Sequence, residues 1–98
     1  MRPVFYERKI GSLRELVDEA VSMDADAGLR ILGRVEGKNC YVFVTRFGEQ
    51  YTAMFYERGP KRGARPGKRL AVEELGGIKE LESMLKRVTT KPVTAFAY

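Results

Sequence analysis

The chain has 98 residues, of which 44% are hydrophobic, enough for one small core and a single domain spanning residues 1–98. It has no histidine and one cysteine, which excludes a zinc site of nitrogen and sulfur ligands and excludes histidine-dependent catalysis. The net charge is +5, and the charged fraction of 32% beside only one Asn and one Gln is typical of a heat-adapted protein.

The first ten residues predict a short strand, and the next dozen predict a helix. In residues 3–10, Val4, Tyr6, Arg8 and Ile10 alternate with Phe5, Glu7 and Lys9. The segment begins with a proline and is charged, as an edge strand tolerates. This N-terminus lacks the apolar region of a signal peptide, and no apolar run approaches a membrane span, so we expect a cytoplasmic protein. Ser12 and Glu15 fit a capping box, and apolar residues recur at helical spacing through residues 12–23.

Residues 29–58 predict three antiparallel strands joined by two-residue type II′ turns at Gly37-Lys38 and Gly48-Glu49. Counting from the turns places Val42 opposite both Phe55 and Gly33. Alternation gives this sheet two faces. One face is aliphatic and is expected to pack under helix 12–23: Leu29, Ile31, Val35, Cys40, Val42, Val44, Ala53 and Phe55. The other mixes arginine with aromatic residues: Arg30, Leu32, Arg34, Tyr41, Phe43, Thr45, Phe47, Thr52, Met54, Tyr56 and Arg58.

The remaining segments predict a mobile basic loop at 59–68, a short strand at 69–73, a helix at 78–88 and a final strand at 93–98. The element order is therefore β-α-β-β-β-(β)-α-β. We expect an α+β fold with a mainly antiparallel sheet, packed on one side by helix 12–23.

Positive charge is concentrated between Arg58 and Arg69, where six Lys and Arg residues occur without an acid. The rest of the chain has a net charge of −1. Such a segment is either a solvated surface loop or a site for a polyanion, and clustering of one sign favours phosphate binding. The cations expected to contact phosphates are Arg58, Lys61, Arg62, Arg65, Lys68 and Arg69.

The arginine–aromatic face has two interpretations that the sequence leaves open. Helix 78–88 covers the face as a second core layer, with arginines at its rim. Alternatively, the face is a platform on which nucleic-acid bases stack while arginines bind phosphates. Its candidate residues are Arg30, Arg34, Tyr41, Phe43, Tyr56 and Arg58.

No pattern in the chain indicates catalysis, a cofactor or a metal. The phosphate-binding motifs GxGxxG and GxxxxGK[ST] are absent, and no spacing sets two carboxylates against each other. Cys40 is expected to be a small buried thiol. Membrane binding is not expected, because no basic amphipathic helix accompanies the basic loop.

The run YTAMFYERGPKRGARPGKRLAV followed by IKELESMLKRV gives the span 29–88 three strands, a basic Gly/Pro loop, a short strand and a helix. This order resembles the single-strand nucleic-acid-binding cofactor and Pur-type module, which implies a curved sheet that binds single strands and a helix that dimerises. The additional N-terminal strand and helix depart from that module. The composition also resembles that of small basic proteins of heat-loving archaea, several of them ribosome-associated. Neither resemblance assigns a role to any residue.

The sequence thus predicts a non-catalytic nucleic-acid-binding protein, with RNA preferred over DNA. The alternative is a protein-interaction or oligomerisation module. In that case helix 78–88 or strand 93–98 supplies the contact, including that of a homodimer, and the basic loop docks on an acidic partner.

Overall fold

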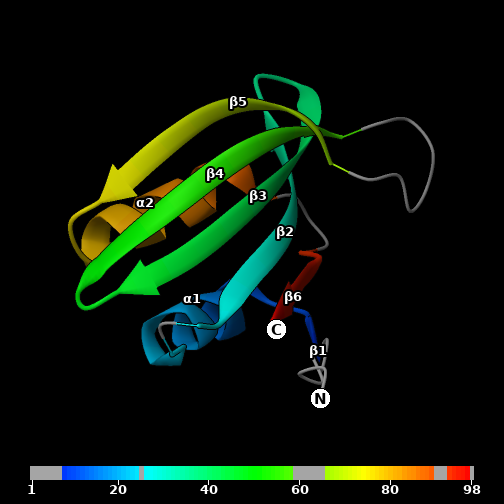
Figure 1. The fold of residues 1–98 in the computed structure, drawn as a ribbon. Coiled ribbons are helices and arrows are strands. Elements are labelled where there is room, and N and C mark those ends of the chain that lie inside the picture. Colours follow the sequence, from blue (N-terminus) through cyan, green and yellow to red (C-terminus); the bar gives the residue numbers. More distant parts are fainter. Residues whose placement is uncertain (1–7, 25, 59–65, 90–92, 98) are drawn as a thin grey trace, which may run out of the picture.

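The computed structural model describes residues 8–24, 26–58, 66–89 and 93–97, and these form a six-stranded antiparallel sheet with two helices (Figure 1). The α+β class predicted from the sequence is confirmed. The order of strands across the sheet is β1-β6-β2-β3-β4-β5. The elements are β1 (Arg8–Ile10), α1 (Leu13–Ser22), β2 (Gly28–Val35), β3 (Lys38–Phe47), β4 (Gln50–Arg58), β5 (Pro66–Leu75), α2 (Ile78–Val88) and β6 (Ala95–Ala97).

Both ends of helix α1 are held by side chains. At its start the Ser12 hydroxyl accepts a hydrogen bond from the backbone N–H of Glu15 at 3.2 Å, which is one of the two bonds of the predicted capping box. The Glu15 carboxylate accepts from the backbone N–H of Gly11 at 3.4 Å instead of from that of Ser12. The last turn contains no basic residue. Arg46 of β3 supplies one, because its guanidinium donates to the carbonyl oxygens of Val21 at 2.5 Å and Met23 at 3.2 Å. Helix α1 is thereby fixed to the β3–β4 hairpin.

The turn predicted for one of the two hairpins agrees with the structure, and the other does not. In β3–β4 the register is confirmed, with Val42 opposite Phe55, and Gly48 adopts the positive φ of 63° that a type II′ turn needs. In β2–β3 the predicted turn is wrong by one residue, since the loop is Glu36-Gly37 with φ of 50° and 80°, as in a type I′ turn. The pairing shifts by two residues, so Val42 lies opposite Ile31 instead of Gly33. An even shift leaves every side chain on its predicted face.

Two predicted elements differ from the structure, and a third is described only in part. Strand β5 begins at Pro66, so residues 66–68 belong to a strand and not to the predicted loop, whose residues 59–65 lie outside the described part. The predicted N-terminal strand is described only over its last three residues. The predicted final strand is described as Ala95–Ala97, and it pairs with β1 on one side and β2 on the other. It is therefore an internal strand and cannot offer a free edge for a homodimer.

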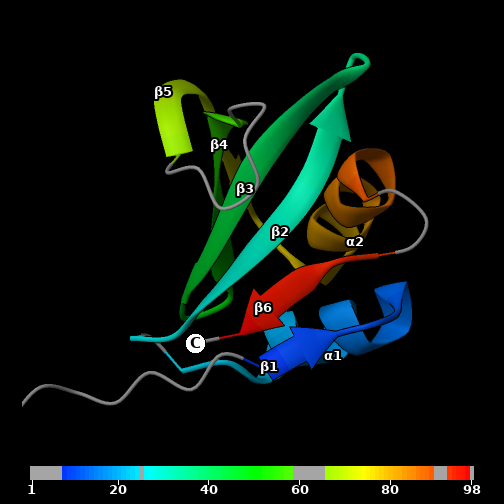
Figure 2. The same ribbon diagram turned by 90° about the vertical axis from the view of Figure 1, so that its right-hand side faces the viewer.

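Both helices pack on the aliphatic face, which corrects the expectation that helix 12–23 alone covers it (Figure 2). The buried core contains Leu16 and Ala20 of α1, Leu81, Met84, Leu85 and Val88 of α2, and Ile31, Val42, Val44, Ala53 and Phe55 of the sheet. The apolar stripe of α2 is thus used within the chain and is not available for dimerisation. Within the described residues, no helix is both long and apolar enough to cross a bilayer.

Candidate nucleic-acid interface

The face of the sheet turned away from both helices is called here the open face (Figure 2). Strand pairing aligns one row of its residues across all six strands: Lys9, Phe96, Arg30, Phe43, Met54 and Val72. The face also contains Leu32, Arg34, Tyr41, Thr45, Thr52, Tyr56, Arg58, Arg69 and Glu74. Helix α2 lies on the opposite side, so the interpretation in which it covers this face is wrong.

Three aromatic rings form a cluster at the centre of the open face. The ring of Phe43 meets Tyr56 edge to face at a centroid distance of 5.3 Å, and it lies 6.2 Å from Tyr41. The Tyr56 hydroxyl donates to the Met54 sulfur at 3.7 Å. Tyr41 is only 8% exposed, whereas Phe43 and Tyr56 are half-buried. Tyr41 therefore supports the cluster, and the other two rings present surface to solvent.

Two arginines lie over aromatic rings at the sides of this cluster. The guanidinium carbon of Arg30 is 5.2 Å from the centroid of Phe96, and that of Arg58 is 5.9 Å from the centroid of Tyr41. Both are cation–π contacts, which hold a flat cation against the sheet. A guanidinium carries five N–H donors, and stacking occupies its face without using the donors at its edge. Arg34 is exposed, and its Nε donates to Asn39 at 3.4 Å.

The described part of the basic segment extends this positive surface along β5. Lys68 and Arg69 are exposed, and Arg69 pairs with Tyr56, which places it on the open face. The ion pairs between described residues join Arg87 to Glu73 and Lys86 to Glu82, and so involve neither of these cations. The other predicted phosphate-binding residues of the segment, Lys61, Arg62 and Arg65, lie outside the described residues.

Sequence reasoning missed Lys9 and Phe96 as members of the candidate interface. They join it because β6 inserts between β1 and β2, which pairs Phe96 with both Lys9 and Arg30. Alternation within the last strand puts Phe96 on the face opposite Ala95, but no local signal reveals which strands flank it. This pairing joins distant parts of the chain and is visible only in the fold.

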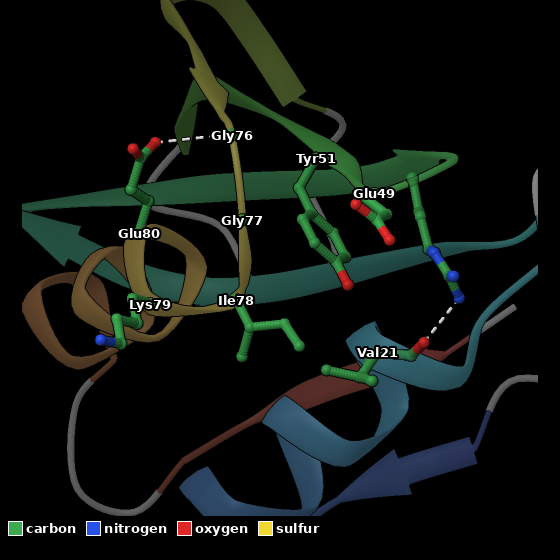
Figure 3. Close-up of a pocket in the computed structure, with 9 residues that line it drawn as sticks. Val21, Glu49, Tyr51, Gly76, Gly77, Ile78, Lys79 and Glu80 are labelled. Atoms are coloured by element: carbon green, nitrogen blue, oxygen red, sulfur yellow. Dashed lines mark hydrogen bonds between the residues drawn. The ribbon is translucent and has the colours of Figure 1, made fainter.

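A cavity of about 510 Å³ lies on the helix side, between α1, the β3–β4 turn and the start of α2 (Figure 3). Two of its polar side chains are paired within the protein. Arg46 donates to Val21, and the carboxylate of Glu80 accepts the backbone N–H of Gly76 at 2.8 Å. None of the site residues predicted from the sequence lines this cavity, and we assign it no ligand.

Cys40 is buried on the aliphatic face, as predicted. Burial raises the pKa of its thiol, although the charge of Arg58 and a hydrogen bond with the Val35 backbone act in the opposite direction. A buried thiol with a raised pKa is a poor nucleophile, which fits a structural role.

The open face thus brings together all six predicted sheet residues with two that were not predicted. Among the described residues of the paired strands, its cations are Lys9, Arg30, Arg34, Arg58 and Arg69, and its one acid is Glu74. Comparison of the chain with protein-family models, curated proteins and solved structures found no match.

Proposed function

We propose that this protein is a non-catalytic nucleic-acid-binding protein of the cytoplasm, with RNA preferred over DNA. The observation that carries the proposal is the open face, where cations surround an accessible pair of aromatic rings. Arg30 and Arg58 bind phosphates or base edges, and Phe43 and Tyr56 offer ring surface for stacking. Arg69 of the basic segment adds a phosphate contact on the same face, and Lys61, Arg62, Arg65 and Lys68 of that segment supply further phosphate contacts.

The expected energies of these two kinds of contact differ in a way that can be measured. Phosphate contacts release counterions, so each contact lowers the slope of log K against log salt by about 0.7 for a single strand. Base stacking on an aromatic side chain contributes about 1–3 kcal/mol per base and depends little on salt. The open face combines both, so we expect binding that salt weakens without abolishing.

RNA is preferred because aromatic platforms on sheets are common among RNA-binding domains. Reading a duplex through its major groove requires a protruding helix or a two-stranded ribbon. Helices α1 and α2 lie on the far side of the sheet from the open face. Neither helix can therefore enter a major groove of the nucleic acid that the open face contacts.

A titration with single- and double-stranded RNA and DNA at two salt concentrations tests the proposal. The informative variant is Arg30→Gln/Arg58→Gln, which removes two charges from the open face. The matched control is Lys79→Gln/Lys86→Gln, which removes two charges from exposed positions of α2. We expect the first variant to bind single strands more weakly. The slope of its log K against log salt should be less steep by about 1.4, because two phosphate contacts are lost.

The control is expected to bind as the wild type does. A wild-type protein that binds none of the four polymers at low salt contradicts the proposal. Equal losses in both variants would show that net charge, and not the open face, governs binding.

A further inference from the structure

The outer edge of β5 is an exposed ladder of backbone groups. Strand β5 runs over ten residues at one end of the sheet order, and among the described residues it pairs with β4 only (Figure 1). Such an edge is a template for a further strand, and proteins protect it with bulges, prolines or charges in its middle. Here the irregular register is confined to the first half of the strand, and pairing from Ala71 to Leu75 is regular.

The middle of this edge is apolar and exposed. Leu70 is 55% exposed and Val72 47% exposed, and Ala71 between them is also exposed. Beside Leu70 and Ala71, on the helix side of the sheet, is a hollow of about 370 Å³ that is also lined by Phe55 and by Arg87 of α2. An edge kept free of partners has little reason to present this apolar run at its centre.

The charges on either side of the apolar run have opposite signs. Lys68 and Arg69 precede it. Glu74 follows it, together with Glu73, which also forms an ion pair with Arg87 of α2. When two β5 strands run antiparallel and overlap about Ala71, the basic half of each lies against the acidic half of the other. The bulge in the first half of β5 shifts the residue pairs between the two copies by one position. The basic half of one strand still lies against the acidic half of the other. Parallel pairing would instead oppose like charges.

We propose that β5 is a self-association edge, at which a second copy of this chain adds its own β5 antiparallel to form one continuous twelve-stranded sheet. The contact is isologous, with a two-fold axis at right angles to the sheet near Ala71. The open faces of the two copies then lie on the same side. This contact replaces the two predicted from sequence, since β6 is internal and the α2 residues Leu81, Met84, Leu85 and Val88 are buried. It does not depend on nucleic-acid binding.

Sedimentation equilibrium of protein freed from nucleic acid, over a range of concentrations, tests this inference with charge-exchange variants. The acidic-edge variant is Lys68→Glu/Arg69→Glu, and the basic-edge variant is Glu73→Lys/Glu74→Lys. We expect the wild type to reach twice the monomer mass of 11.1 kDa. Each variant alone is expected to associate about a hundredfold more weakly or worse, because like charges then oppose each other.

Mixing the two variants restores complementary halves, so an equimolar mixture is expected to form the heterodimer. This recovery shows that both variants are folded. The control Lys79→Glu/Lys86→Glu makes the same charge change on α2 and is expected to remain dimeric. The inference is overturned if the wild type stays monomeric up to about 1 mM, if the edge variants associate as the wild type does, or if the mixture does not associate.

Discussion

The guanidinium of Arg30 lies 5.2 Å from the ring centroid of Phe96, a contact between the first long strand of the sheet and the last strand of the chain. The two residues also pair directly across β2 and β6. Because β6 in turn pairs Phe96 with Lys9 of β1, both ends of the chain contribute to the open face. The candidate interface therefore exists only when the whole sheet is assembled.

A double-mutant cycle measures the coupling between these two residues. Arg30→Gln and Phe96→Leu each remove one partner of the cation–π contact, and we expect a coupling energy of about 0.5–1 kcal/mol in urea unfolding. The pair Arg34→Gln and Phe96→Leu serves as control, because Arg34 makes its hydrogen bond to Asn39 instead. Equal coupling in both cycles would contradict a specific contact.

Phe43 is the aromatic residue at the centre of the open face, in contact with both tyrosines. Phe43→Leu keeps an apolar side chain but removes the ring, so we expect affinity for single-stranded RNA to fall about tenfold, the effect of one lost stacking contact. Fluorescence anisotropy with a labelled oligonucleotide measures it. Ile78→Ala, which truncates a half-exposed side chain on α2, should leave affinity unchanged.

Arg46 holds the end of α1 through the carbonyl oxygens of Val21 and Met23 and also donates to Gly48 at 2.7 Å. Replacing it by methionine removes this side-chain donor from all three carbonyl oxygens. We expect Arg46→Met to lower the free energy of unfolding by about 1–3 kcal/mol and to speed hydrogen exchange in the last turn of α1. Arg14→Met, at an exposed position of the same helix, should change stability little. An unchanged free energy of unfolding in Arg46→Met would refute the anchoring role.

Gly33 lets the end of α2 approach β2 closely. A Cβ atom at this position would lie 2.8 Å from the backbone oxygen of Val88, which cannot move aside as a flexible side chain can. We expect Gly33→Ala to destabilise the protein by about 1–3 kcal/mol through overpacking. Gly11→Ala is the control, because nothing lies within 4 Å of the added atom there. Thermal or urea unfolding of the two variants should differ clearly; similar stabilities would contradict this packing.

The thiol of Cys40 makes stability depend on alkaline pH. Burial raises its pKa in the folded state above the ordinary value of 9.0, so the unfolded state ionises first as pH rises. The stability that the buried neutral thiol contributes is complete at pH values below 9.0 and is lost as pH rises through the folded-state pKa. The Cys40→Ala variant lacks this pH-dependent contribution to stability and has a small cavity at every pH. Urea unfolding at about pH 8 and about pH 10 should therefore show the stability gap between wild type and variant narrowing. A constant gap would contradict a buried, neutral thiol.

Local patterns predicted much of the fold. The range of α2, the cap of α1 and the register of β3–β4 follow from spacing and turn chemistry alone. The β2–β3 turn was misplaced because a glycine was assigned to the first turn position. In the structure Glu36 adopts a positive φ, which side chains other than those of Asn, Asp and Gly seldom do. The faces remained correct, because the error moved the register by an even number.

Long-range pairing could not be predicted in the same way. The side chains of β6 alternate between the two faces whether the strand lies at an edge or inside the sheet, and its place between β1 and β2 depends on partners distant in the chain. The apolar stripes of α1 and α2 likewise show that each helix packs, but not that both pack on one face. The packing of both helices on the aliphatic face determines the candidate site, because it leaves the arginine–aromatic face without a helix.

Chemical-shift mapping of the backbone amides during titration with a short single-stranded RNA tests most directly whether the open face is the interface. We expect the perturbed residues to lie on β2, β3 and β4 around Arg30, Phe43 and Tyr56, with the exposed positions of α1 and α2 unaffected. Perturbations confined to the helices, or none at any RNA concentration, would contradict the account.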